Sequence, residues 1–383
     1  MMNRADRSGF AAWWWTVDRV ALFAMFTLVV LGLMLAFAAS PAATGGPFTE
    51  GDFRYAAKQI AFAGIAVVLL AFTSMLSLRA IKVAAMFIYG GALIGSLFVV
   101  FTGGAVLGAK RWIDLGLFTL QPSEFLKPSF AILAASILAD RAKMVLPKEL
   151  IAFLLAAPAL VILVLQPDLG QTALLIALWG ALLFFAGVPL AFVAVLAAAS
   201  SLLLVLAYFS FPYVHHRIDQ FLDPHKMGYQ AELALRAFAH GGITGVGPGA
   251  GTVKYHLPDA HSDFIFAVAG EEFGIVLCGA IALLFCVLCV RLLLRAARMG
   301  DNFSRLAGAG LAIVVALQAF INMSVALELM PTKGMTLPFI SYGGSSLFAV
   351  ALTMGFALAT TRQRSKIGER DYALFSFLKE APA

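Results

Sequence analysis

The densest group of residues that could do chemistry spans 257–266, in the order Leu-Pro-Asp-Ala-His-Ser-Asp-Phe-Ile-Phe, directly before a long apolar segment. Pro and Asp in front of an apolar run mark a loop that leads into a helix, so Asp263 stands where an acidic N-cap is expected. A carboxylate that is held rigidly and partly desolvated could instead act as a general base. The spacing alone leaves both interpretations of Asp263 open.

Two more acids, Glu271 and Glu272, follow inside the apolar segment. Adjacent residues of a helix point about 100° apart, so these two carboxylates cannot share one partner. Acids in such segments are costly and are rarely without a role. We expect Glu271 and Glu272 to support a site rather than to carry out its reaction.

A second polar cluster begins with Lys110, Arg111 and Trp112. Paired cations beside a tryptophan suit a phosphate group at the edge of a membrane. The alternative is that these side chains are ordinary interfacial anchors whose charged ends reach water.

Lys127 lies about one turn inside an apolar segment and three residues after Glu124. A lone lysine near the centre of a membrane helix costs about 2.5–3.5 kcal/mol, so a partner is expected. Glu124 and Asp168 are the two candidates. We expect this group to have a structural role.

Two glycine-rich stretches remain. The run 241–251 lacks a preceding strand and a G-K-[ST] ending, so it gives little support to a nucleotide site. Its backbone N–H groups could still approach an anion. Ser341, Gly343 and Gly344 open the last apolar segment with small residues, which favours close packing or an irregular helix beside a cavity.

The elements that position these residues are membrane helices. Of the 383 residues, 61% are hydrophobic and 13% are charged, against about 25% charged in soluble domains, and the mean hydropathy is +0.92. Apolar segments of spanning length lie near 20–39, 56–76, 83–101, 123–139, 150–165, 171–187, 189–209, 264–294, 304–329 and 338–360. The sequence therefore predicts an all-α, polytopic integral membrane protein of about ten transmembrane helices.

The first apolar run is too long for a signal peptide and is expected to be retained. The short turns at 166–168 and 187–189 make the helices that they join antiparallel neighbours.

The basic residues predict the orientation of the chain. Of its 27 Lys and Arg residues, 17 lie in segments that are inside if the N-terminus is cytoplasmic, 9 lie outside, and Lys127 falls within a helix. Cytoplasmic segments carry the excess of such residues. We expect one membrane domain over 1–383, cytoplasmic segments at 1–19 and 361–383, and one large extracytoplasmic (periplasmic) loop at 210–263 that concentrates function.

Taken together, these motifs resemble the SEDS family (shape, elongation, division and sporulation). The matching stretches follow the family's order and extend over most of the chain: 110–116 (KRWIDLG), 121–127 (QPSEFLK), 166–170 (QPDLG), 221–224 (FLDP), 229–230 (YQ), 241–249 (GGITGVGPG), 257–274 and 331–346. The stretches 245–254, 257–264 and 331–346 look more like the division members than the elongation members. Pro-Asp at 258–259, in place of the commoner Pro-Glu, resembles the alphaproteobacterial division members.

The resemblance implies a peptidoglycan glycosyltransferase that polymerises lipid II outside the bacterial cytoplasmic (inner) membrane, at the division septum. It implies a class B penicillin-binding protein and other divisome membrane proteins as partners, and no nucleic acid. The family's essential aspartate matches Asp263, and its Arg-Trp pair matches Arg111 and Trp112. Ser262 and His256 depart from the commoner Thr and Tyr or Phe, but neither change removes a group that the chemistry needs.

The other expected substrate contacts are Lys110, Lys254 and His261. A divalent cation, Mg²⁺ or Mn²⁺, could assist, although no metal ligand is assigned. Two other functions stay open. A lipid II transporter would also hold polar residues in its bundle, but the candidate residues cluster on one face and no inverted repeat is evident. A non-catalytic scaffold for division proteins is also compatible with the sequence.

Overall fold

The structure, a computed structural model, describes residues 9–44, 53–102, 111–116, 118–140, 145–223, 228–331 and 334–362. Each of the ten predicted apolar segments forms a helix, which confirms the all-α membrane fold. These helices are α2 (Arg19–Thr44), α3 (Arg54–Met75), α4 (Leu78–Thr102), α5 (Ser123–Ala139), α6 (Lys148–Leu165), α7 (Leu169–Phe185), α8 (Leu190–Ser210), α11 (Ile265–Ala297), α12 (Asn302–Ala326) and α13 (Gly344–Thr360). Within the described ranges, seven are long and apolar enough to cross a membrane by length and composition.

The remaining elements lie between or before these helices. A short helix, α1 (Gly9–Thr16), precedes α2, and β1 (Ile113–Asp114) pairs antiparallel with β2 (Thr119–Leu120) before α5. The predicted loop 210–263 holds two helices, α9 (Pro212–Leu222) and α10 (Tyr229–Gly241), and a 3-10 turn, η2 (Val253–Tyr255). Because α10 packs against α11, the segment 210–263 is not simply a loop outside the bundle, and part of it packs on the membrane helices.

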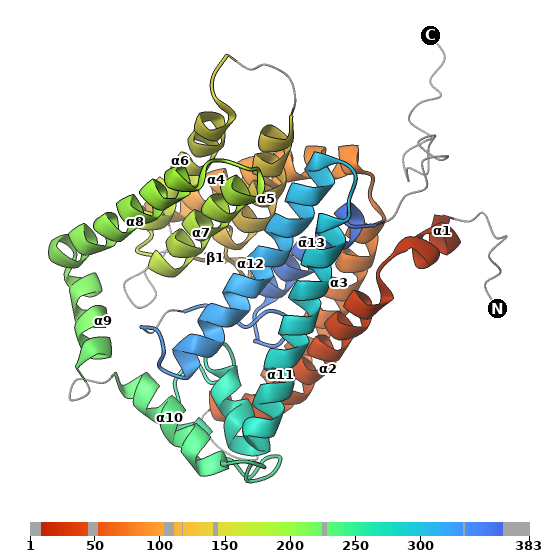
Figure 1. Ribbon diagram of the computed structural model, residues 1–383. Coiled ribbons are helices and arrows are strands. Elements are labelled where there is room, and N and C mark those ends of the chain that lie inside the picture. The colour runs from red at the N-terminus through yellow and green to blue at the C-terminus, as the bar shows by residue number, and fades with distance from the viewer. Residues whose placement is uncertain are drawn as a thin grey trace.

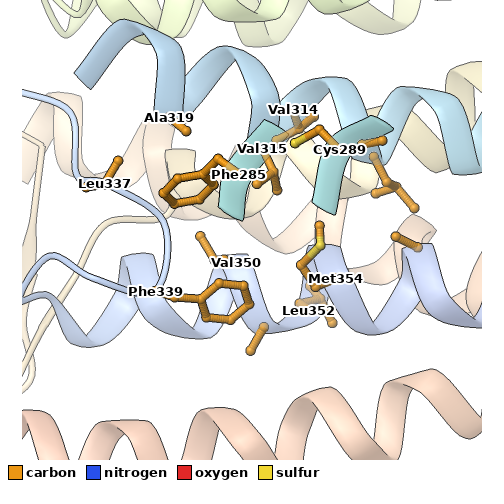
Figure 2. Close-up of a cluster of buried hydrophobic side chains, with 14 of the residues drawn as sticks. Phe285, Cys289, Val314, Val315, Ala319, Leu337, Phe339, Val350, Leu352 and Met354 are labelled. Carbon is orange, nitrogen blue, oxygen red and sulfur yellow. The ribbon is translucent and has the colours of Figure 1, made fainter. Parts of the chain in front are cut away.

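The helices form a bundle around α12 and α13, with α8 and α9 at its margin (Figure 1). Buried apolar side chains from α11, α12, α13 and the segment before α13 meet in a core that includes Phe285, Val315, Phe339 and Met354 (Figure 2). Near the C-terminal end of α11, Arg291 and Arg295 both pair with Asp18, at distances of 2.8 and 2.6 Å. The start of α2 and the C-terminal part of α11 are thereby joined at one end of the bundle.

The last helix begins later than predicted. The sequence suggests a helix from residue 338, but α13 begins at Gly344, and residues 338–340 form a turn followed by irregular backbone to Gly343. Phe339 has a φ of +64°, a left-handed conformation that a right-handed helix cannot include. Gly343 is the N-cap residue of α13, and a Cβ on Gly344 would lie 3.3 Å from the ring of Phe62. The small residues thus allow the close packing that was one of the two expectations for them.

Helix α11 is broken at Gly274, which has a φ of +73°. The glycine-rich run fills the break, because Val246 N and Gly247 N donate to the carbonyl oxygens of Glu271 and Glu272, both at 3.0 Å. On the other side of the break, Ile275 N donates to Gly242 O at 3.1 Å. The run 241–251 is therefore a structural partner of α11, and the N–H groups of Val246 and Gly247 bind the protein's own carbonyls rather than a foreign anion.

We expect Gly274→Ala to lower the free energy of unfolding by at least about 2 kcal/mol. A left-handed residue with a Cβ costs about 1–2 kcal/mol, and this Cβ would stand 2.2 Å from Ile243 O. The matched control is Gly279→Ala on the same helix, where a Cβ meets nothing within 4 Å. Thermal unfolding of the two purified variants in detergent makes the comparison, and equal melting temperatures would contradict this account of the break.

Candidate active site

Asp263 lies at the end of the turn that leads into α11. Ser262 N and Phe264 N donate to Asp259 O at 3.0 and 3.2 Å, and Asp259 has a φ of +54°. The N-cap residue of α11 is Phe264, and no side chain caps this helix. The alternative in which Asp263 serves as the cap is therefore wrong. Among the described residues, none donates a hydrogen bond to the Asp263 carboxylate.

The surroundings of Asp263 favour its protonated form. Burial, followed by the negative charge of Asp259, raises the pKa of Asp263 to about 7, while the positive charge of Arg111 acts in the opposite direction. The charges of Asp168 and Glu124 add to the increase, so these residues lie within electrostatic range of Asp263. A carboxyl group with a pKa near neutrality is well placed to accept a proton.

Three residues from distant segments hold the turn in place. The carbonyl oxygens of His261, Ser262 and Asp263 each accept one hydrogen bond. The donors are Tyr342 N at 2.9 Å, Ser341 Oγ at 2.5 Å and Asn322 Nδ2 at 2.8 Å, respectively. Asn322 also donates to Met335 O at 2.6 Å. The expected supporting role of Ser341 thus has a specific form, because its hydroxyl group fixes the backbone beside Asp263.

Gly334 leaves room for the Asp263 side chain. A Cβ on this glycine would lie only 3.1 Å from Asp263 Oδ2, so the carboxylate rests close to the backbone of the segment before α13. The Asp263 carboxylate is therefore adjacent to the segment that also supplies Ser341 and Tyr342.

Arg111 is bound to the turn between α6 and α7. Its Nη2 donates to Pro167 O at 2.6 Å and its Nε donates to Gln166 O at 3.2 Å, with Asp168 Oδ2 3.6 Å from Nε. Burial raises the pKa of Asp168, and the charge of Arg111 opposes that change. These contacts fix the Arg111 side chain within electrostatic range of Asp263. A simple interfacial anchor would instead extend its charged end into water. Trp112 is half-buried beside it.

Lys127 has the partner that the sequence requires. Its Nζ donates to Glu124 Oε2 at 2.7 Å and to Gln318 Oε1 at 3.0 Å, and all three residues are buried. The predicted pairing with Glu124 is confirmed, whereas Asp168 pairs with Arg111. Gln171 Nε2 donates to the second oxygen of Glu124. The network links α5, α7 and α12 beneath the site.

Lys254 is buried and bound to other groups of the protein. Its side chain is 1% exposed, its Nζ donates to Ala38 O at 2.7 Å, and the same group pairs with Glu272. The prediction that Lys254 contacts substrate is not supported by this position, because the ammonium group is already buried and paired. Lys110 lies outside the described residues.

Glu271 accepts hydrogen bonds from three consecutive backbone N–H groups, at Thr252, Val253 and Lys254, over distances of 2.7–2.9 Å. His240 Nδ1 lies 2.9 Å from the same carboxylate. Glu272 accepts from Gly249 N at 3.1 Å in addition to Lys254 Nζ. The two acids bind different groups, including two separate atoms of Lys254, and hold the segment 249–254 against α11, which is the supporting role expected of them.

His261 belongs to an aromatic cluster next to the site. Its ring centroid lies 4.7 Å from that of Tyr55 and 5.4 Å from that of Tyr342. Burial lowers the pKa of His261, so the ring is neutral at physiological pH. A neutral imidazole in this position can offer a hydrogen bond or an apolar face to a bound sugar.

Sequence reasoning missed Asn322, Gln318 and Gln171. Asn322 and Gln318 lie one turn apart on α12, on the side that faces Lys127 and the Asp263 turn. Two amides at a spacing of four residues, in a stretch that is otherwise apolar over 306–323, are a signal that could have identified them, because polar side chains in membrane helices face the interior of the bundle.

These features define a class of protein: a multi-pass, all-α membrane protein with a partly desolvated aspartate and a fixed arginine gathered at one end of its bundle. The family described as Cell cycle protein, of FtsW, RodA and SpoVE, matches residues 19–366, and the chain belongs to this family. A relative from Caulobacter vibrioides, named "Probable peptidoglycan glycosyltransferase FtsW", is 44% identical over 94% of this chain and 93% of its own length. One from Halorhodospira halophila with the same name is 36% identical over 92% and 93%.

Solved structures show the same fold. The chain resembles one described as "Structural coordination of polymerization and crosslinking by a peptidoglycan synthase complex", with a TM-score of 0.77, 28% identity, and coverage of 91% of this chain and 99% of that chain. It also resembles the rod shape determining protein RodA of Thermus thermophilus, with a TM-score of 0.68, 26% identity, and coverage of 91% and 98%. The predicted SEDS fold and the likeness to the division member FtsW are confirmed.

We expect Lys127→Met to lower the free energy of unfolding by roughly 3–5 kcal/mol, because it leaves the buried Glu124 carboxylate without its cation. The matched control is the double variant Lys127→Met/Glu124→Gln, which removes both charges and should regain much of the loss. Unfolding of the purified proteins in detergent measures both effects. A single variant as stable as the unmodified protein would show that the pair contributes nothing.

Proposed function

We propose that this chain is a peptidoglycan glycosyltransferase of the FtsW type, which polymerises lipid II into β-1,4 glycan strands during septal cell-wall synthesis. The names of its relatives support the activity. The observation that carries the proposal is the carboxylate of Asp263, which has no hydrogen-bond donor among the described residues and a pKa of about 7. Such a group costs free energy in a fold and is typical of a reacting residue.

Asp263 acts as the general base of a single displacement. The 4-hydroxyl oxygen of the acceptor sugar attacks the anomeric carbon of the growing strand, and the bond from that carbon to the diphosphate oxygen breaks with its electron pair. The hydroxyl proton passes to the Asp263 carboxylate. One displacement converts the α-linked diphosphate into a β-1,4 bond by inversion, so the reaction needs one base and no covalent enzyme intermediate.

Arg111 neutralises the departing diphosphate. A guanidinium group carries five N–H donors, and the carbonyl oxygens of Gln166 and Pro167 engage Nε and one hydrogen of Nη2. No other described residue accepts from this guanidinium group, so its remaining donors have a fixed orientation that favours bidentate recognition of phosphate oxygens. Lys110, the preceding residue, is the second proposed cation. Trp112 and His261 would line the same surface and contact the sugars.

A divalent cation, Mg²⁺ or Mn²⁺, would fit this chemistry if one carboxylate and the substrate diphosphate held it together. The described residues contain no group of three or more His, Cys, Asp or Glu that could hold a metal. Magnesium is commonly bound by one or two carboxylates together with substrate phosphates. Asp259, which is exposed next to Asp263, is the side chain that would hold it, and the ion would supply additional positive charge to the diphosphate.

The partner and the orientation are part of the proposal. A likeness to a chain from a peptidoglycan synthase complex supports a class B penicillin-binding protein as the crosslinking partner, together with other division membrane proteins. The excess of basic residues supports cytoplasmic termini, an external segment 210–263, and a place in the inner membrane at the septum.

A cysteine introduced at His240, which is exposed, tests the orientation. We expect a membrane-impermeant thiol reagent to label it in intact spheroplasts, because this position would face the outside of the cell. A cysteine at Arg298 is the matched control and should react only after the membrane is permeabilised. The reverse pattern would overturn both the orientation and the external site. The native cysteines are Cys278, Cys286 and Cys289, so the experiment uses a background in which they are serine.

We expect Asp263→Asn to reduce polymerisation by roughly 10²–10⁴-fold, the usual contribution of general acid–base catalysis. Asparagine keeps the size of the side chain, and the three hydrogen bonds to the backbone of 261–263 do not involve the carboxylate. Glycan-chain formation from labelled lipid II by the purified complex with its penicillin-binding partner measures the effect. Substantial polymer from a folded Asn variant would move the base elsewhere, and movement of lipid II without polymer would favour a transporter.

The dependence of the rate on pH gives a second measurement on the same site. The base must be deprotonated, so we expect the rate to rise as the pH increases through about 7. In assays without added divalent cations, Asp259→Asn removes a negative charge that raises the pKa of Asp263, and should move this rise to lower pH. An unchanged midpoint would show that the titrating group is not Asp263.

We expect Arg111→Ala to reduce polymerisation by about 10²-fold, as the loss of one fixed donor to a developing charge does in other enzymes. The variant should also be less stable, because Asp168 loses its cation. The double variant Arg111→Ala/Asp168→Asn separates the two effects. If its stability returns while its activity stays low, Arg111 serves the reaction; if activity returns as well, the residue only holds the turn.

A further inference from the structure

An apolar groove lies between α7, α11 and α12, away from the Asp263 site. Its walls are formed by Phe185 of α7, by Val290, Leu293, Leu294 and Ala297 of α11, and by Ala309 of α12, and its volume is about 570 Å³. These residues belong to the C-terminal ends of α7 and α11 and to the start of α12, at the end of the bundle where Asp18 pairs with Arg291 and Arg295. The volume is within the range of small-molecule sites, about 300–1,000 Å³.

One cation lies at the rim of this groove. Arg305, in the first turn of α12, lines the groove and is exposed. In the described part of the chain its guanidinium group has no hydrogen-bond or ion-pair partner, whereas Arg291 and Arg295 are both paired with Asp18. Asp301, the N-cap residue of α12, accepts a hydrogen bond from Ser304 N at 2.8 Å and does not pair with this guanidinium group. The groove is thus apolar and has at its rim one cation without an ion-pair partner among the described residues.

The apolar walls and the single cation together indicate which kind of molecule binds in the groove. A single hydrocarbon chain with an anionic head group matches both parts of the groove, because phosphate oxygens accept the fork of N–H donors of an arginine. A partner helix fits less well. The wall from Val290 to Ala297 is about 10 Å long, and a helix segment of that length and about 10 Å in diameter occupies roughly 800 Å³, more than the groove contains. Basic residues near membrane ends also attract anionic lipids.

We propose that the groove between α7, α11 and α12 binds the acyl chain of an anionic phospholipid, whose phosphate pairs with Arg305. This lipid would join the second half of α11, beyond the break at Gly274, to α7 and α12. A ligand that binds only the folded protein stabilises it, so the bound lipid should raise the melting temperature. The proposal does not depend on the glycosyltransferase activity.

The test uses the purified full-length chain in detergent, with phosphatidylglycerol and phosphatidylcholine of identical acyl chains as probes. Native mass spectrometry counts retained lipids, and thermal unfolding reports their effect on stability. We expect preferential retention of one phosphatidylglycerol molecule and a higher melting temperature. Arg305→Gln should lower the affinity for phosphatidylglycerol about tenfold, the effect of losing one hydrogen bond to a charged group, and should remove the preference.

Two further variants make the result specific. Arg79→Gln removes an exposed cation of α4 that does not line the groove, and should leave binding unchanged. Ala297→Trp fills the groove from its exposed side and should abolish lipid retention while Arg305 remains. Equal retention of the two lipids, equal effects of the Arg305 and Arg79 variants, or unchanged binding to the Ala297 variant would each overturn the proposal. So would a co-purifying polypeptide, in place of lipid, that is displaced by Ala297→Trp.

Discussion

Backbone N–H and C=O groups at membrane depth must find partners inside the protein, and this constraint determines how the site is built. The irregular segments of the chain satisfy one another. The run 242–247 exchanges hydrogen bonds with the broken part of α11, and the turn 261–263 is held by Tyr342, Ser341 and Asn322. Non-helical backbone can therefore exist at the end of the bundle without being mobile. The rigidity of Asp263 follows from this pairing.

Among the described residues, the buried acids follow the same rule, whereas no donor binds the Asp263 carboxylate. The buried acids are paired: Glu271 accepts from three backbone N–H groups, Glu124 from Lys127 and Gln171, and Asp18 from two arginines. Removing a partner from such a group leaves an uncompensated buried charge, which is strongly destabilising. These acids support the architecture, because their carboxylate oxygens already accept hydrogen bonds from other groups of the protein. A general base at neutral pH needs a carboxylate that is not stabilised in its ionised form by such donors.

The helices could be predicted from the sequence because long apolar segments have few alternatives in a membrane. The residues around Asp263, Arg111 and Lys127 could also be identified from the sequence, since charged side chains near such segments are costly and usually have a functional or structural role. Other features depend on contacts that residue types do not encode. Lys254 was expected at the substrate, but Glu272 and Ala38 surround its ammonium group. The late start of α13 depends on the left-handed conformation of Phe339, which no local sequence signal requires.

Asp263 differs from the other acids in how it is held. Its backbone and that of the two residues before it are fixed by donors from α12 and from the segment before α13. Its carboxylate lies beside Gly334 and accepts no hydrogen bond from the part of the chain that the structure describes. Position and charge are thus controlled by separate groups. If the carboxylate itself supplied the anchoring, each hydrogen bond to it would stabilise the ionised form and weaken it as a base. Because the anchoring acts through carbonyl oxygens, the side chain keeps a raised pKa and a fixed position at once.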